Sequence, residues 1–230
     1  MPQSEQKSRP IRSYVLRQGR MTEGQQKAYE ALWPRYGLEL ESAPLDLSGL
    51  FEQIQPVTLE IGFGNGESLR QMAQHQPQHN FLGVEVHGPG VGHLMIQLDQ
   101  HQLNNVRILK QDAMELLRHH LQPGSLQRVQ LYFPDPWHKR KHNKRRIVQD
   151  EFAELIQRVL IPGGVLHMAT DWEDYARQMM RVLSAHQGFQ NQAGEGNFSP
   201  RPETRPLTKF EQRGERLGHG VWDLLFERLA

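Results

Sequence analysis

Residues 57–67 read Val57-Thr58-Leu59-Glu60-Ile61-Gly62-Phe63-Gly64-Asn65-Gly66-Glu67. The apolar run Val57–Ile61 predicts a buried strand, and the glycines after it predict a tight turn where the backbone can approach a ligand because no Cβ intervenes. The helical pattern that begins at Glu67 would point its first amide groups at the same ligand. A dinucleotide-binding loop has the pattern G-x-G-x-x-G, and Glu67 stands where its last glycine would be, which disfavours a nicotinamide-dependent oxidoreductase. A glycine-rich turn without any ligand is the simpler alternative.

The same strand–turn–helix unit recurs along the chain. The apolar runs expected to form strands are Val57–Ile61, Phe81–Val86, Val106–Leu109, Val129–Phe133 and Val165–Ala169. The segments with helical spacing are Glu67–His75, Gly92–His101, Met114–Leu121, Val148–Leu160 and Glu173–His186. This alternation predicts an α/β fold with a mostly parallel sheet and helices on both faces. It stops after His186, and the last apolar run, Val221–Leu229, predicts an antiparallel pair of strands at the edge of the sheet.

The chain has 230 residues, which suits one domain with a modest extension. Residues 1–45 are polar and are predicted to be an N-terminal extension. It contains one short helix, near Thr22–Trp33, which Pro34 and Gly37 close. Residues 46–230 are predicted to form a single domain.

The chain contains no cysteine, which excludes disulfides, thiolate zinc sites and cysteine nucleophiles. No signal segment is visible and no apolar run approaches the roughly 20 residues that span a bilayer, so a cytoplasmic protein without membrane contact is expected. His138 and His142 have the spacing of a metal-ligand pair. No cysteine or nearby carboxylate completes the set, so no metal site is predicted.

Acidic residues mark the ends of three predicted strands. Glu60 belongs to the first strand, Glu85 closes the second and Asp112 follows the third. Parallel strands end at one edge of a sheet, where acids can bind a nucleoside-type cofactor through its ribose and adenine groups. S-adenosyl-L-methionine suits such a site, because carboxylates attract its ammonium and sulfonium groups. As alternatives, Glu85 is a solvated strand end and Asp112 caps a helix together with Glu115.

The fourth predicted strand ends in Pro134-Asp135-Pro136-Trp137. The two prolines exclude a helix and fix the direction of the Asp135 carboxylate, beside the glycine loop. The motif is partly similar to the Asp-Pro-Pro-aromatic element of methyltransferases that act on exocyclic amines, so an exocyclic-amine RNA or DNA methyltransferase is the alternative function. A proline-rich turn with Trp137 covering the core is the structural alternative.

The nine residues that follow, His138 to Arg146, hold six Lys or Arg and no acid. The whole chain has 27 Lys and Arg against 26 Asp and Glu, so without these six the balance would be −5. A basic segment next to a strand end indicates binding of a phosphate backbone. A solvated loop is the alternative, and the absence of acids weakens it.

Three motifs together resemble the bacterial tRNA (guanine-N7-)-methyltransferase family. They are Pro134-Asp135-Pro136-Trp137-His138-Lys139 with His142 and Lys144-Arg145-Arg146, then Arg12-Ser13-Tyr14-Val15 with Gly19-Arg20, and Arg205-Pro206-Leu207-Thr208-Lys209-Phe210-Glu211 with Arg213. The resemblance runs over nearly the whole chain and implies the class I methyltransferase fold, a Rossmann-like sheet of seven strands with a C-terminal antiparallel hairpin. It implies transfer of a methyl group from S-adenosyl-L-methionine to N7 of guanine 46 in the variable loop of tRNA, and no obligate protein partner is evident.

The resemblance also implies roles for individual residues. Besides Gly62 and Gly64 of the loop, the implied cofactor contacts are Glu60, Glu85, Asp112 and Asp135, and Asp135 is the implied catalytic residue. Implied substrate contacts are Lys139, Asp171, Thr208, Lys209, Phe210 and Glu211. Implied RNA contacts are Lys141, His142, Asn143, Lys144, Arg145 and Arg146. Two residue roles have alternatives, in which Asp171 instead caps a helix and Phe210 instead belongs to the core. For the whole protein, the alternative is an RNA-binding protein without turnover.

Overall fold

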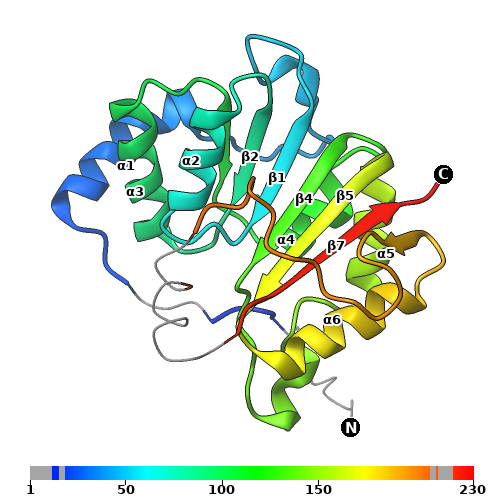
Figure 1. Cartoon of the computed structure of the whole chain (residues 1–230). Helices are drawn as coiled ribbons and strands as arrows, with labels where there is room; N and C mark the ends of the chain where they lie inside the picture. Colours follow the sequence, from blue (N-terminus) through cyan, green and yellow to red (C-terminus); the bar gives the residue numbers. More distant parts are fainter. Residues whose placement is uncertain (1–11, 16–18, 208–210, 212–219) are drawn as a thin grey trace, which may run out of the picture.

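A computed structural model describes residues 12–15, 19–207, 211 and 220–230. Its centre is a seven-stranded sheet in the order β3-β2-β1-β4-β5-β7-β6 (Figure 1). The strands are β1 (Val57–Ile61), β2 (Asn80–Val84), β3 (Val106–Leu109), β4 (Leu126–Tyr132), β5 (Leu160–Thr170), β6 (Phe189–Asn191) and β7 (Trp222–Arg228). Strands β1 to β5 pair in parallel, and β7 runs antiparallel between β5 and β6. The predicted mostly parallel sheet with an antiparallel C-terminal pair is confirmed.

Helices cover both faces of this sheet. The helical elements are α1 (Glu23–Tyr36), η1 (Leu47–Gly49), α2 (Glu67–His75), α3 (Gly88–Gln100), α4 (Ala113–Glu115), η2 (Leu116–His120), η3 (Arg140–Arg145), α5 (Asp150–Val159) and α6 (Glu173–Ala185). Residues of α2 and α3 form one apolar cluster against the sheet, and residues of η2, α5 and α6 form the other. The layers therefore bury both faces of the strands, and β1 and β2 are buried along their whole length.

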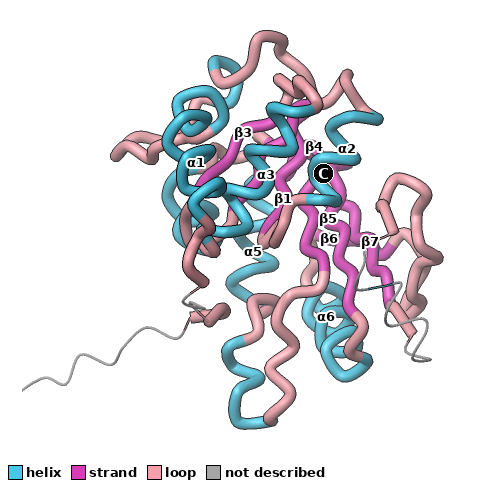
Figure 2. The backbone as a smooth tube through the Cα atoms, turned by 90° about the vertical axis from the view of Figure 1, so that its left-hand side faces the viewer, coloured by secondary structure: helices cyan, strands magenta, loops and turns pink. Residues whose placement is uncertain are grey.

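Helix α1 begins with a reciprocal cap. The Thr22 hydroxyl accepts a hydrogen bond from the Gln25 amide at 3.2 Å, and the Gln25 side chain accepts one from the Thr22 amide at 2.9 Å. The helix ends at Tyr36, later than expected, because Pro34 is tolerated in its last turn. Figures 1 and 2 show α1 beside α3, and Tyr36 is fully buried there. Helix α1 of the predicted extension thus packs into the same hydrophobic core as α2 and α3.

Two boundaries differ from the sequence-based expectation in a way that affects the site. Strand β2 ends at Val84, so Glu85 lies beyond the strand. Helix α3 begins at Gly88, four residues before the predicted start, and Pro89 stands in its first turn, where a proline costs no hydrogen bond. The turn between β2 and α3 is therefore short, and Glu85 lies at the start of the helix.

Candidate active site and nucleic-acid interface

The glycine loop joins β1 to α2 and leaves open space beside it. Gly62, Gly64 and Gly66 have φ values of 70°, 58° and 77°, in the left-handed region that favours glycine. A Cβ on Gly62 or Gly64 would meet no other heavy atom within 4 Å. A Cβ on Gly66 would lie 2.6 Å from the Leu94 side chain, so this glycine serves the packing of α2 against α3. Gly62 and Gly64 therefore form the side of the loop that can receive a ligand.

Glu60 is buried under this loop and has an unsatisfied oxygen. The residue is 3% exposed, and within the described residues no hydrogen-bond donor reaches Glu60 Oε2. Burial, and then the nearby negative charge of Glu85, raise the pKa of Glu60 to about 8. A buried carboxyl group of this kind costs stability unless a ligand supplies the missing donor. The site thus fits the ammonium group of an amino-acid-type ligand.

Glu85 holds the loop and the next helix in place. Its carboxylate accepts hydrogen bonds from the amides of Gly64 at 2.9 Å, Val86 at 2.7 Å and His87 at 2.9 Å. A carboxylate oxygen has two lone pairs, so these bonds leave acceptor capacity for ligand hydroxyl groups. Glu85 is therefore a structured part of the site, unlike the solvated strand end that was the alternative.

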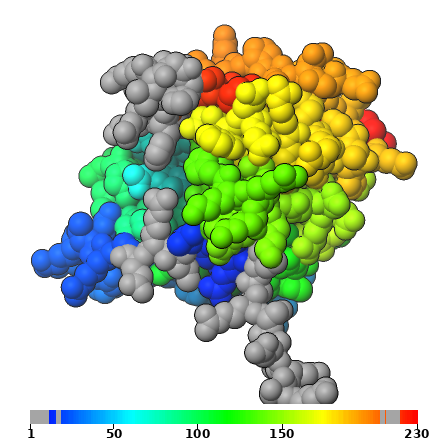
Figure 3. Space-filling view, turned by 90° about the horizontal axis from the view of Figure 1, so that it is seen from below, coloured from blue at the N-terminus to red at the C-terminus, as the bar shows by residue number. Residues whose placement is uncertain are grey.

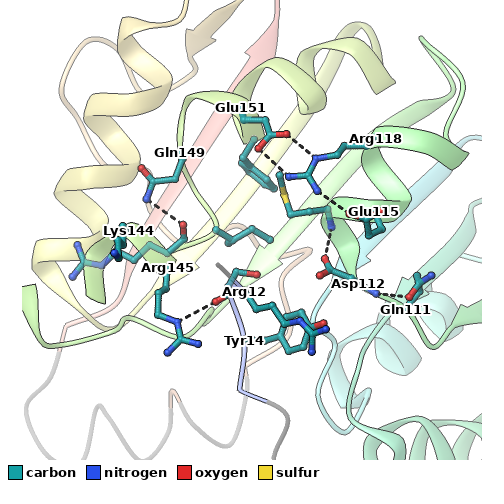
Figure 4. Close-up of a pocket in the computed structure, with 15 residues that line it drawn as sticks. Arg12, Tyr14, Gln111, Asp112, Glu115, Arg118, Lys144, Arg145, Gln149 and Glu151 are labelled. Atoms are coloured by element: carbon teal, nitrogen blue, oxygen red, sulfur yellow. Dashed lines mark hydrogen bonds and ion pairs between the residues drawn. The ribbon is translucent and has the colours of Figure 1, made fainter. Parts of the chain in front are cut away.

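Asp112 serves as a helix cap and also lines a cavity. Its Oδ1 atom accepts a hydrogen bond from the Met114 amide at 2.8 Å, as the capping alternative expected. The cavity has a volume of about 500 Å³ (Figure 4). Its apolar walls include Met114, Ile147 and Phe152, and Tyr14 lies beside Asp112. A flat aromatic group with a polar edge fits a cavity of this composition.

The Pro134–Trp137 segment leaves β4 with a strained backbone. Phe133 and Trp137 flank it with φ values of 50° and 49°, and only one other non-glycine among the described residues has a positive φ. Bulky residues in this region cost free energy and mark sites where the backbone direction matters. The Phe133 amide is anchored to the Ala169 carbonyl oxygen at 2.8 Å. Asp135 is consequently exposed at the end of the strand, next to the glycine loop on β1.

The basic segment forms η3, and most of its cations face solvent. Lys139, Arg140, Lys141 and Lys144 are exposed. His142 and Asn143 are half-buried. Partial burial, and then the neighbouring lysine and arginine charges, lower the pKa of His142, so it adds no positive charge at neutral pH. The exposed lysines and Arg140 therefore carry most of the positive potential of this surface.

Arg146, predicted as an RNA contact, is turned into the protein in this structure. Arg146 is 2% exposed, and its guanidinium group donates to the Pro136 carbonyl oxygen at 2.8 Å, to Gln178 Oε1 at 2.8 Å and to Asp174 Oδ2 at 2.7 Å. These contacts fasten the end of the basic segment to α6. A run of like charges contains no signal for which side chain turns inward, so sequence reasoning missed this role.

Arg205 and Glu211 of the C-terminal motif belong to a buried polar network. Arg205 pairs with Glu211 through two hydrogen bonds of 2.7 Å and with Asp223 through bonds of 2.8 and 2.9 Å. Glu211 is 3% exposed, and its carboxylate accepts hydrogen bonds from Arg205. In this structure the Glu211 side chain is therefore not positioned to contact a guanine directly. Thr208, Lys209 and Phe210 lie outside the described residues.

The network continues to the end of β4. His167 Nε2 lies 2.7 Å from Asp223 Oδ1, and its Nδ1 atom lies 3.0 Å from the Tyr132 hydroxyl. Burial lowers the pKa of His167 even though Asp223 opposes this effect. The neutral ring therefore donates from Nε2 to Asp223 and accepts at Nδ1 from Tyr132. Sequence reasoning placed Arg205 in a motif without assigning its role and missed Asp223 and His167, because buried ion pairs between distant segments have no local pattern.

Asp171 is exposed at the end of β5, beside Trp172. Trp172 is the first flanking residue of α6 and no side chain caps this helix, so Asp171 does not act as the cap that was its alternative role. The ring of Trp172 meets His138 edge-on at a centroid distance of 4.3 Å. Asp171 therefore lies in the same neighbourhood as the basic segment.

Within the described residues, no group of three histidines or carboxylates is placed to hold a metal ion. In the same part of the chain, no helix has the length and apolar character needed to cross a membrane.

Comparison with known proteins agrees with this geometry. Residues 54–224 match a family model described as "Putative methyltransferase". The chain is 57% identical over 221 residues to the tRNA (guanine-N(7)-)-methyltransferase of Hydrogenovibrio crunogenus, covering 96% of this chain and 92% of the relative. It is 56% identical over 229 residues to the enzyme of the same name from Alcanivorax borkumensis, covering 100% and 96%. The chain belongs to the tRNA (guanine-N7-)-methyltransferase family.

A solved structure supports the fold of the family independently. The 16S rRNA methyltransferase KamB superposes with a TM-score of 0.61 at 16% identity, covering 85% of this chain and 99% of KamB. At this identity the likeness concerns the fold alone. The expected class I methyltransferase architecture is confirmed.

Proposed function

We propose that this protein transfers the methyl group of S-adenosyl-L-methionine to N7 of a guanine in tRNA. The observation that carries the proposal is the 56–57% identity, over nearly the full chain, to enzymes of this name. The motif resemblance specifies guanine 46 of the variable loop as the target. The arrangement of the acidic strand ends beside a basic segment supports the same reaction.

The cofactor lies across the ends of β1 to β4 in this proposal. Gly62 and Gly64 allow its close approach, and Glu60 faces its ammonium group. Glu85 accepts from the ribose hydroxyls, and Asp112 accepts from the adenine amino group. The cofactor supplies an electrophilic methyl group on a sulfonium.

Asp135 acts on the nucleophile. Guanine N7 has a free lone pair, so it needs no base, and the problem is to hold N7 in line with the methyl group. Positive charge moves onto the purine during transfer, and a fixed carboxylate beside the purine stabilises that charge. The strained exit from β4 gives Asp135 the rigid position that this role requires.

RNA contacts come from the exposed cations and the neighbouring polar residues. Lys139, Lys141 and Lys144 bind the phosphate backbone. Asp171 remains proposed as a contact to the guanine edge, and Glu211 contributes by shaping the site through Arg205. The target base must be unstacked or presented in a loop, because A-form RNA hides N7 in its deep groove.

The function is tested by the identity of the product. Bulk tRNA is incubated with labelled S-adenosyl-L-methionine, then cleaved chemically at N7-methylguanine and sequenced. Cleavage at guanine 46 is expected. Labelled tRNA that is not cleaved, and whose label elutes with a base methylated on its exocyclic amine, would favour the alternative enzyme. Unlabelled tRNA together with intact cofactor binding would favour an RNA-binding protein without turnover.

Replacing Glu60 by Gln is expected to remove the pH dependence of cofactor binding. The pKa of about 8 keeps Glu60 protonated at neutral pH in the free protein. The cofactor ammonium favours the ionised form, so binding should release a proton, and affinity should rise by up to about tenfold per pH unit below about pH 7.5. Calorimetry in buffers of different ionisation enthalpy measures this release.

The Glu60→Gln variant should also be more stable than the parent protein at alkaline pH. Because the pKa of Glu60 is raised in the free folded state, its contribution to stability is greatest below pH 4.5, the usual pKa of a glutamate. That contribution is lost progressively as the pH rises to about 8. Glu154→Gln, at an exposed carboxylate of α5, is the control and should leave both properties unchanged. Equal proton release by Glu60→Gln and the parent would show that Glu60 is not the titrating group.

Replacing Lys141 and Lys144 by Gln is expected to weaken tRNA binding and its salt dependence. Each lost phosphate contact lowers the slope of log K against log salt by about 0.7–0.9, so the double variant should lose roughly 1.5 from the slope. Binding is measured at several salt concentrations. Lys27→Gln, at an exposed lysine of α1, is the control, and an unchanged slope in the double variant would show that η3 does not face RNA.

A further inference from the structure

Residues Arg12–Tyr14 lie along the cavity at the ends of β3 and β4. Arg12, Ser13 and Tyr14 all line it, together with Asp112 and Met114 (Figure 4). In the space-filling view, blue N-terminal residues lie against the green segment that follows β4 (Figure 3). The next described residue is Gly19, which packs closely on His87, just beyond β2. A Cβ on Gly19 would lie 2.6 Å from the His87 ring. Arg12 to Tyr14 and Gly19 therefore lie near the strand ends that form the cofactor site.

Two residues of the methyltransferase motif hold this segment by its backbone. Trp137 Nε1 donates to the Ser13 carbonyl oxygen at 3.0 Å, and Arg145 Nε donates to the Arg12 carbonyl oxygen at 3.2 Å. The Arg145 guanidinium also lies 4.1 Å from the centroid of the Trp137 ring, so the two residues support one another. Because both bonds go to main-chain carbonyls, they set the position of the segment regardless of its own side chains.

The held segment places Tyr14 beside Asp112. Burial, and then the negative charge of Asp112, raise the pKa of the Tyr14 hydroxyl, so it stays neutral and donates its hydrogen bond to Asp112. The cavity of about 500 Å³ remains open with Tyr14 in this position. Tyr14 therefore forms a wall of the cavity and does not fill it.

We propose that Tyr14 is a cofactor-binding residue, and that Arg12, Ser13 and Tyr14 form the outer wall of the pocket for the adenine group. The inference rests on the proposed function, which places the cofactor over Asp112. The Tyr14 ring lines the same cavity as Met114 and Phe152, so a flat base bound there would find apolar side chains to pack against. Trp137 and Arg145 are positioning residues for this wall, so part of the basic segment serves the cofactor pocket.

The test measures the affinity of S-adenosylhomocysteine by calorimetry, in the absence of tRNA. Tyr14→Ala should raise Kd by about tenfold, an effect of about 1.4 kcal/mol. Tyr14→Phe should have a smaller effect, because it keeps the ring. Trp137→Phe should weaken binding severalfold without touching the ligand, because it removes the bond to Ser13. Val15→Ala, at an exposed position of the same segment, is the matched control and should bind like the parent.

Two results would overturn the proposal. An unchanged Kd in Tyr14→Ala would show that the segment is not part of the pocket, and a lower Kd would show that Tyr14 competes with the cofactor. Thermal unfolding of each variant confirms that it is folded. Failure of the parent protein to bind S-adenosylhomocysteine or to methylate tRNA would instead contradict the proposed function, so the two failures are distinguishable.

Discussion

Asp135→Asn is expected to lower the single-turnover rate of methyl transfer about 10²–10³-fold while tRNA affinity stays unchanged. Asparagine keeps the shape of the side chain but removes the charge that stabilises the purine as N7 is methylated. Asp135 is exposed and separate from the cations of η3, so the substitution should not weaken the electrostatic part of RNA binding. Rapid quench with saturating enzyme measures the chemical step, and filter binding measures the affinity.

Asp135→Ala should be at least as slow as Asp135→Asn, because it also loses the side chain that positions the base. Glu154→Gln removes an exposed carboxylate of α5 and serves as the control, with a rate like that of the parent protein. A rate in Asp135→Asn within a few-fold of the parent would remove Asp135 from the mechanism. A fall in tRNA affinity with an unchanged rate would make it a binding residue only.

Arg205→Met is expected to cause the largest loss of stability, because it removes the cation that bridges two buried carboxylates. Asp223 and Glu211 are 2% and 3% exposed, and Arg205 bridges them. Removing one member of a buried ion network typically costs about 3–5 kcal/mol. At about 2–4 °C per kcal/mol for a chain of this size, Tm should fall by roughly 10 °C. Thermal and urea unfolding measure the change.

Arg201→Met is the matched control for this substitution. Arg201 also lies near Glu211, at 4.0 Å, but its side chain is 43% exposed. Exposed pairs contribute about 0–1 kcal/mol, so this variant should unfold close to the parent protein. Equal losses in the two variants would show that burial of the Arg205 network does not govern its contribution.

Much of the fold follows from local sequence patterns. The boundaries of β1, β3 and α2 agree with their predictions to the residue. These elements combine a clear periodicity with glycine or polar residues at their ends, and both signals lie within a few positions. The acids at the ends of the parallel strands could also be placed together, because the topology of such a sheet brings its carboxyl ends to one edge.

Other properties depend on residues far away in the chain. Arg146 resembles its basic neighbours in sequence, and only Asp174 and Gln178 on α6 make it a buried anchor. Glu211 has the chemistry of a guanine contact, and Arg205 and Asp223 turn it into part of a buried network.

Amino-acid types and their spacing thus determined the succession of strands and helices along the chain, the glycine loop, the acidic strand ends and the family. Tertiary structure decided which charges face solvent and which are neutralised inside. It also brought Tyr14 beside Asp112, 98 positions further along the chain. The physical reason is that periodicity and turn chemistry act over a few residues, whereas burial, ion pairing and pKa shifts depend on groups that only the folded chain brings together.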